Sequence, residues 1–203
     1  MQYNRSLAEL LGAFALTFVV WLATVFPMPV PAAVMAALTL GLFVYLVGGV
    51  SGAHLNPAVT IGILSIKKIS PKDAAMYILA QLAGASLALL VGMALSQGKM
   101  AYMPHDADMV AGLAEAIGAF FLCFAVTAVT LGKVEKSAAG VVVGGSLFIG
   151  IFMASVFSNA ILNPAVALGV GSFGSMYILG PVVGAVAGAW AAKWMLGAKK
   201  AAK

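Results

Sequence analysis

The sequence predicts an all-α membrane protein with six transmembrane helices and two re-entrant half-helices, built as an inverted repeat of three plus three spans. Three observations carry this prediction: an apolar composition, six long apolar stretches, and the tripeptide Asn-Pro-Ala at both 56–58 and 163–165. Of the 203 residues, 63% are hydrophobic and only 8% are charged, a composition that a water-soluble domain could not cover. We therefore expect an integral membrane protein with a single transmembrane domain, 1–203.

Six apolar stretches have about the 20 residues that an α-helix needs to cross the hydrocarbon core of a bilayer. They are residues 4–26, 31–50, 71–96, 109–131, 138–157 and 175–196. The connections are short and leave no room for a soluble catalytic module, so we do not expect an enzyme. The single cysteine, Cys123, excludes a disulfide framework and is expected to be a small buried hydrophobe.

The second half of the sequence repeats the first. LAELLGAF at 7–14 matches LAEAIGAF at 113–120, and YILAQ at 77–81 matches YILGP at 177–181. The two Asn-Pro-Ala copies are offset by 107 residues (163 minus 56), close to the 106 (113 minus 7) of the first match. Three matches in the same order indicate a duplication.

The duplication also predicts the topology. The first repeat covers about 1–98 and the second about 107–203, and each contains three spans. Because three is an odd number, the second repeat must enter the membrane upside down relative to the first. Inverted repeats with broken helices place the working site near the middle of the membrane, where the two halves meet.

Each Asn-Pro-Ala copy begins a segment that is too short to cross the membrane. Asn caps helix starts, and Pro at the first helical position has no N–H to leave unpaired, so each copy predicts a loop that turns into a half-helix. The oxygen of Asn56 or Asn163 can cap its own helix while the amide NH2 remains free as a donor. Two such helices meeting from opposite sides would place two donors and two positive helix ends at one point. This arrangement favours neutral molecules and opposes cations.

The net charge of +5 is explained by topology, so nucleic acid is not an expected partner. With six spans, ten of the eleven Lys and Arg fall on one side, which the positive-inside rule makes cytoplasmic, together with both termini. They are Arg5, Lys67, Lys68, Lys72, Lys133, Lys136, Lys193, Lys199, Lys200 and Lys203. Only Lys99 is expected outside, beside His105, Asp106 and Asp108.

The residues SGAHLNPAVT at 51–60 closely resemble the first signature of the aquaporin (major intrinsic protein) family. AQLAGA at 80–85 and GPVVGA at 180–185 also resemble that family, and the resemblance covers essentially the whole chain. It implies six tilted helices with two half-helices, and a homotetramer in membrane lipid with one pore per subunit. Passage would be passive, with no cofactor or metal, in a prokaryotic cytoplasmic (inner) membrane. The implied pore motifs are Asn56, Pro57, Ala58, Asn163, Pro164 and Ala165.

The same resemblance implies roles for three buried polar residues. Glu9 and Glu115 would be structural carboxylates that accept hydrogen bonds from the re-entrant loops behind the pore. Carboxylates inside a membrane are also candidates for proton relays, and that alternative stays open. His54 is expected to brace its loop, because no second metal ligand stands at a useful spacing.

Four positions correspond to the family's selectivity filter by their distance from the signature Asn residues. Ala36 stands twenty residues before the first Asn, and Ile151, Ala160 and Val166 stand twelve before, three before and three after the second. The family almost always has Arg where this chain has Val166. That replacement removes up to five donors and a fixed positive charge, so we expect a wide and weakly polar ring.

The predicted function is a passive channel for water and small uncharged solutes such as glycerol-like polyols, closed to ions and protons. Some bacterial aquaglyceroporins associated with arsenic resistance resemble this chain in carrying Val at the Arg position, which adds metalloid hydroxides to the candidate solutes. Ala167 replaces the Asp of the glycerol branch, so the sub-branch is open. The alternatives are a strict water channel, a proton- or ion-coupled secondary transporter, and an ion channel made leaky by the loss of Arg.

Overall fold

The protein is described by a computed structural model that covers residues 2–104 and 108–197. Within these residues the chain is helical throughout and contains no strand. The helices are α1 (Gln2–Val25), α2 (Ala32–Ser51), α3 (Pro57–Ser65), α4 (Pro71–Leu95), α5 (Met109–Thr130), the 3-10 helix η1 (Lys136–Ala138), α6 (Ala139–Ala154), α7 (Pro164–Gly169) and α8 (Ser175–Leu196). Five residues used in the charge argument lie outside the described residues, namely His105, Asp106, Lys199, Lys200 and Lys203.

Six of these helices are long and apolar enough to cross a membrane: α1, α2, α4, α5, α8, and α6 together with η1. The predicted fold class is thereby confirmed. The largest boundary error is in the fifth span, which was expected to reach residue 157 but ends at Ala154. The physical reason is a turn, in which the Phe157 amide bonds to Ala154 O, and the Ser158 hydroxyl donates to a buried carboxylate of α5.

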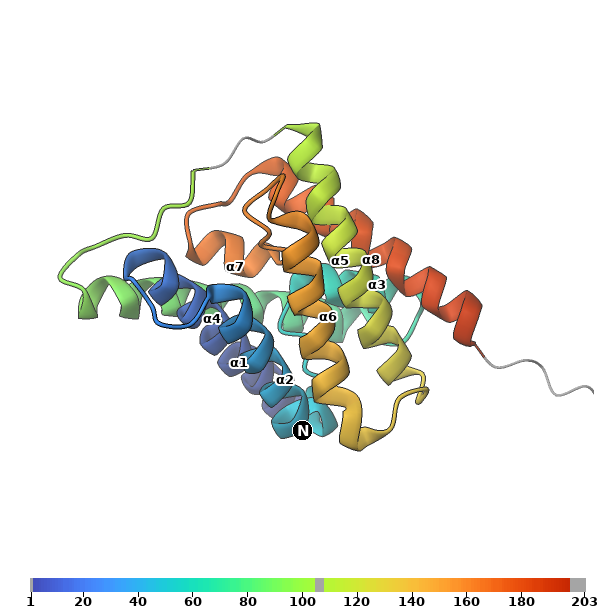
Figure 1. Cartoon of the computed structure of the whole chain (residues 1–203). Helices are drawn as coiled ribbons and strands as arrows, with labels where there is room; N and C mark the ends of the chain where they lie inside the picture. The colour runs from blue at the N-terminus through green and yellow to red at the C-terminus, as the bar shows by residue number, and fades with distance from the viewer. Residues whose placement is uncertain (1, 105–107, 198–203) are drawn as a thin grey trace, which may run out of the picture.

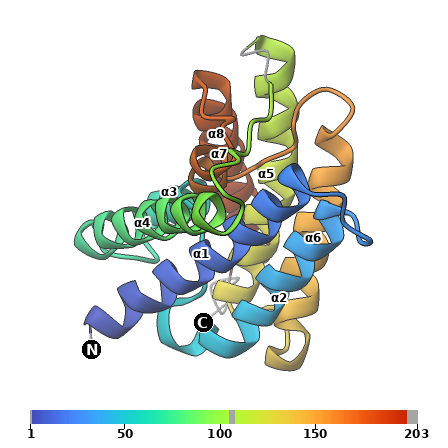
Figure 2. The ribbon, with the colours of Figure 1, turned by 90° about the vertical axis from the view of Figure 1, so that its left-hand side faces the viewer.

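The two short helices lie inside the arrangement of long ones. Figure 1 shows α3 behind α6 and α7 to the left of α6, and Figure 2 shows α1 and α2 on the side that faces left in Figure 1. α3 packs against α8, α4 and α5, whereas α7 packs against α4 and α1, and the two short helices also contact each other. The re-entrant segments are therefore enclosed by protein, where irregular backbone inside a membrane is tolerated.

The two repeats use equivalent helix pairs as their main packing surfaces. α1 packs on α4 in the first repeat, α5 packs on α8 in the second, and α2 and α6 join the two halves. Glycines make the close approach possible, since a Cβ at Gly84 would collide with the Leu10 carbonyl oxygen and one at Gly184 with the Ala116 carbonyl oxygen. Small residues let membrane helices approach backbone to backbone in this way.

Gly184→Ala is expected to lower the stability of the folded protein by about 1–3 kcal/mol, because the added methyl must push two helix backbones apart. Gly145→Ala is the matched control, since nothing lies within 4 Å of a Cβ at that position. Thermal unfolding in detergent, followed by circular dichroism, measures both variants. Equal melting temperatures would show that the α5–α8 contact does not need its glycine.

Candidate functional site

Each re-entrant loop ends in an Asn that caps the half-helix behind it. The side-chain oxygen of Asn56 accepts a hydrogen bond from the Ala58 amide at 2.8 Å, and that of Asn163 accepts from the Ala165 amide at 3.0 Å. In both helices Pro occupies the first turn, as expected where the backbone lacks intrahelical partners. The caps orient the two Asn side chains in the same way, each at the start of its own short helix.

The amide groups of the two Asn residues join the loops to each other. Asn56 Nδ2 donates to Leu162 O at 2.9 Å, and Asn163 Nδ2 donates to Leu55 O at 3.0 Å. Each NH2 group is thus a donor, as expected, but one of its N–H groups is used between the loops. An amide NH2 carries two N–H donors, so one on each Asn is left for another acceptor.

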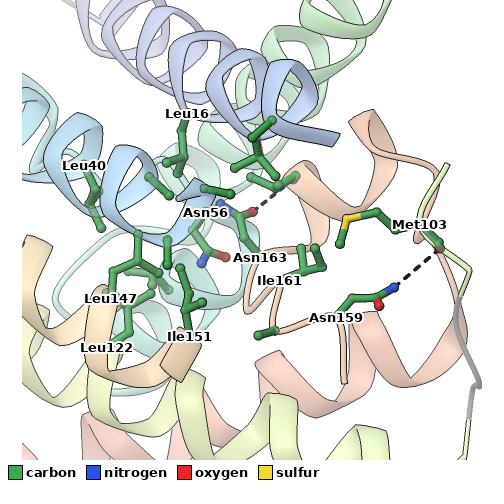
Figure 3. Close-up of a pocket in the computed structure, with 18 of the residues that line it drawn as sticks. Leu16, Leu40, Asn56, Met103, Leu122, Leu147, Ile151, Asn159, Ile161 and Asn163 are labelled. Atoms are coloured by element: carbon green, nitrogen blue, oxygen red, sulfur yellow. Dashed lines mark hydrogen bonds between the residues drawn. The ribbon is translucent and has the colours of Figure 1, made fainter. Parts of the chain in front are cut away.

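A cavity of about 200 Å³ runs past this Asn pair. Asn56 and Asn163 both line it, and their side chains lie side by side in Figure 3. The four positions predicted as a filter, Ala36, Ile151, Ala160 and Val166, also line it. Among the residues that line it there is no Lys, Arg, Asp or Glu, and most of the wall is aliphatic.

A second cavity, of about 700 Å³, adjoins the first at His54, which lines both. Its wall is more polar and carries Arg5, Lys68 and Lys136 with a single carboxylate, Asp73. The first cavity is thus mostly apolar and lined by the Asn pair, whereas the wall of the second is basic. Together they follow the re-entrant loops on both sides of the Asn pair.

Glu9 fixes the first re-entrant loop from behind. Its carboxylate accepts hydrogen bonds from the Ser51 hydroxyl (2.6 Å), the His54 amide (3.0 Å), the Leu55 amide (2.6 Å) and Gln81 Nε2 (2.8 Å). The side chain has no exposed surface and lines neither of the two cavities. These four donors occupy both oxygens of the carboxylate.

Glu115 holds the second loop in the same manner. It accepts from the Ser158 hydroxyl (2.8 Å), the Ile161 amide (2.9 Å) and the Leu162 amide (2.6 Å), and it too is fully buried. Both loops include a leucine in the left-handed backbone region, with φ of 50° at Leu55 and 56° at Leu162. That conformation is unfavourable for a branched side chain and persists only where the surroundings fix it. The two carboxylates supply part of that fixation.

The paired Asn-Pro-Ala loops and the six spans can now be set beside known proteins. The sequence profile of the family described as Major intrinsic protein (MIP) matches residues 2–192 of this chain. The chain belongs to the major intrinsic protein family. The resemblance drawn from the residues at 51–60 is thereby confirmed at the level of the family.

Several relatives of this family are similar to the chain over most of its length. Aquaporin NIP1-4 of Oryza sativa subsp. japonica is 38% identical in an alignment of 161 residues that covers 74% of this chain and 57% of that protein. Aquaporin AqpM of Methanothermobacter thermautotrophicus is 30% identical in an alignment of 162 residues that covers 69% of this chain and 66% of that protein. This chain thus spans about three fifths of the length of these relatives.

The fold has a counterpart among solved structures. The X-ray structure of the aquaglyceroporin from Plasmodium falciparum superposes with a TM-score of 0.72 and 24% sequence identity. The match covers 94% of this chain and 95% of that one. At this identity it supports the fold of the major intrinsic protein chain described here and nothing finer.

The structure of this major intrinsic protein adds polar residues that the sequence did not single out. The Thr60 hydroxyl accepts a hydrogen bond from Gln81 Nε2 at 3.0 Å and lies 3.2 Å from His54 Nδ1. The two repeats therefore differ in the polar contacts behind their re-entrant loops. His54 also packs edge-on against Tyr77, with ring centroids 5.4 Å apart. Gln81 lies in one of the repeated segments, and the equivalent position in the second copy is Pro181. This difference between the copies is the sequence signal that could have pointed to Gln81.

Two further lining residues, Met103 and Asn159, come from outside the recognised motifs. Both line the first cavity together with Val166. Met103 lies in the connection between α4 and α5, and Asn159 follows the turn after α6. No periodicity or spacing in the sequence places a residue of that long connection against the second loop.

Proposed function

We propose that this chain is a passive transmembrane channel for water and small uncharged solutes. The observation that carries the proposal is the mostly aliphatic cavity that is lined by both Asn56 and Asn163, each with an amide N–H left to donate. A solute oxygen passing this point can exchange water hydrogen bonds for bonds from the amides, while the apolar wall offers little to bind it. No chemical step is needed, so we propose no enzymatic activity.

The selectivity filter is proposed to be formed by Ala36, Ile151, Ala160 and Val166. These side chains contribute neither a charge nor a hydrogen-bond donor to the cavity that they line. A filter that strips water from a solute needs polar groups to replace it. We therefore infer that polyols such as glycerol pass as well as water, and that metalloid hydroxides of similar size are further candidates.

Cations are proposed to be excluded at the Asn pair. The N-terminal ends of α3 and α7 meet there, each carrying the partial positive charge of a helix start, equivalent to about half an elementary charge. Protons are opposed as well, because the Asn donors force a passing water to accept and thus interrupt a hydrogen-bonded water chain. The first cavity contains no carboxylate that would offset this barrier.

The orientation proposed for the membrane has both termini in the cytoplasm. Arg5, Lys68 and Lys136 come from three separate segments, and all three line the second cavity, which is consistent with one basic side. We place that side in the cytoplasm of a prokaryotic inner membrane. A homotetramer in lipid with one pore per subunit is also proposed, and native mass spectrometry from detergent measures the subunit number.

Ala36→Trp is expected to reduce solute and water flux to near the level of empty liposomes, because a large ring would fill a cavity of about 200 Å³ beside the Asn pair. Leu38→Trp is the matched control, since Leu38 stands on the same helix with 63% of its surface exposed. Stopped-flow light scattering on proteoliposomes with water, glycerol, urea and arsenite gives the fluxes. Wild-type flux in Ala36→Trp would contradict the assignment of this cavity as the pathway.

Three alternatives are distinguished by flux and conductance measurements on the reconstituted protein. A coupled transporter would need an ion gradient, and its candidate carboxylates, Glu9 and Glu115, are already surrounded by three or four donors each. An ion channel would show conductance in planar bilayers. A strict water channel would pass water and exclude glycerol. Flux of neutral solutes without any ion gradient, and without conductance, is the result expected here.

A further inference from the structure

We propose that Met103 is a specificity-determining residue, which narrows the outer mouth of the channel in place of the large filter side chains that this chain lacks. The inference rests on the proposed channel function and names a residue outside the four filter positions. The role assigned is size selection among neutral solutes, with water affected least.

The position of Met103 supports this role. Its side chain reaches from its loop towards the cavity centre in Figure 3, with the sulfur near the end that points inward. It is partly buried against the hydrophobic core, and it lines the cavity together with Ile161 and Val166. Since Ala36, Ala160 and Val166 are all small, Met103 is one of the largest side chains on this part of the wall.

The backbone around Met103 is fastened to the second re-entrant segment. The Met103 amide donates to Val170 O at 3.2 Å, directly after α7. Asn159 Nδ2 donates to Pro104 O at 3.0 Å, contacts Met103 O at 3.4 Å, and donates to the Ser172 hydroxyl at 2.8 Å. The loop is therefore tied to the segment that begins with the second Asn-Pro-Ala.

A glycine makes the close contact between the two segments possible. Gly171 has φ of 70°, and a Cβ there would lie 2.8 Å from the carbonyl oxygen of Ala101. Ala101 is itself almost fully buried. The connection thus lies directly on the end of α7, and Met103 follows Ala101 by two residues into the cavity.

The chemistry of methionine suits a soft constriction. Its side chain has three rotatable bonds and a polarisable thioether, so it can move aside for a solute at a modest cost. It offers no strong hydrogen bond to replace those that a polyol loses on entering. A wider solute must displace it and a water molecule need not, so the side chain should slow glycerol more than water.

Removing the side chain should therefore change the selectivity of the channel. Met103→Ala is expected to raise the ratio of glycerol to water permeability about threefold to tenfold, in the range that pocket size alone can supply. Met103→Leu keeps most of the volume and should stay within about twofold of wild type. Met100→Ala is the matched control, because Met100 is in the same connection with 64% of its surface exposed.

A separate variant tests whether the contact between Gly171 and Ala101 positions Met103. Gly171→Ala adds a methyl that must displace the Ala101 carbonyl, so it should raise the same ratio by moving Met103. In the double variant with Met103→Ala the second change should add little, because both act through one side chain. Stopped-flow light scattering on proteoliposomes measures all five variants.

The outcomes separate the two proposals. A wild-type chain that passes neither water nor glycerol above empty liposomes contradicts the channel itself. If both fluxes are present but Met103→Ala has the same ratio as Met100→Ala, only the role of Met103 is overturned. Additive effects of Gly171→Ala and Met103→Ala would likewise contradict the positioning of Met103 by this contact.

Discussion

Val166→Arg is expected to cut glycerol flux strongly while water flux stays measurable. Val166 lies in the first turn of α7, 3% of its surface is exposed, and it lines the cavity just beyond the Asn pair. An arginine there would add a long side chain with five donors and a fixed charge to a wall that has neither. The ring would become narrow and polar, a filter through which water fits and glycerol does not.

The structure also offers acceptors for such a guanidinium. Met103 lines the same cavity, and the carbonyl groups of Met103 and Pro104 accept from Asn159 Nδ2. Proton exclusion should change little, because the Asn donors at the middle of the channel are untouched. A pH-sensitive dye inside the liposomes reports that leak alongside the light-scattering signal.

Val166→Met separates the two effects of the arginine. It adds comparable length without donors or charge, so it should reduce glycerol flux less than Val166→Arg does. Glycerol flux that is unchanged in the arginine variant would show that position 166 does not face the constriction, and the whole assignment of the filter would be wrong.

Glu9→Gln is expected to destabilise the folded protein by about 3 kcal/mol, the cost of leaving buried donors without an acceptor. Glu9 accepts two backbone N–H groups, a hydroxyl and an amide, and none of its surface is exposed. A glutamine in the same place keeps one acceptor oxygen but turns an NH2 group towards groups that also donate. The loop before α3 would lose the bonds that fix its unfavourable backbone.

The exposed Glu135→Gln is the control for this prediction, since it makes the same chemical change at the surface. Thermal unfolding in detergent should show a lower midpoint for Glu9→Gln only. The measurement also addresses the proton-relay alternative. A relay predicts that Glu9→Gln also changes the response of uptake to a pH gradient.

Local signals in the sequence accounted for most of the fold. Long apolar stretches predicted the six spans to within a few residues, because a helix in lipid must satisfy its backbone internally and must match the bilayer thickness. Asn before Pro predicted the starts of α3 and α7, because capping depends on neighbouring residues alone. Counting from these two Asn residues then selected four positions that line one cavity.

The hydrogen bonds that join the two halves could not be predicted from the sequence and are visible only in the tertiary structure. The bonds from Asn56 to Leu162 and from Asn163 to Leu55 link residues that are 106 and 108 positions apart, and no local pattern encodes them. They consume one donor of each amide, which the sequence had left free. The end of α6 at Ala154 also depends on a residue that is distant in the sequence, because Ser158 donates a hydrogen bond to the buried Glu115 carboxylate of α5.

What the sequence by itself determined about this protein is therefore its six membrane-spanning helices and the places where its half-helices begin. Only the tertiary structure decided how the wall of the cavity is completed, as Met103 shows. That residue reaches the cavity because its loop is bonded to Asn159 and to the end of α7. Helix starts and spans depend on short-range sterics and on transfer from water, whereas the position of a loop depends on bonds to residues far along the chain.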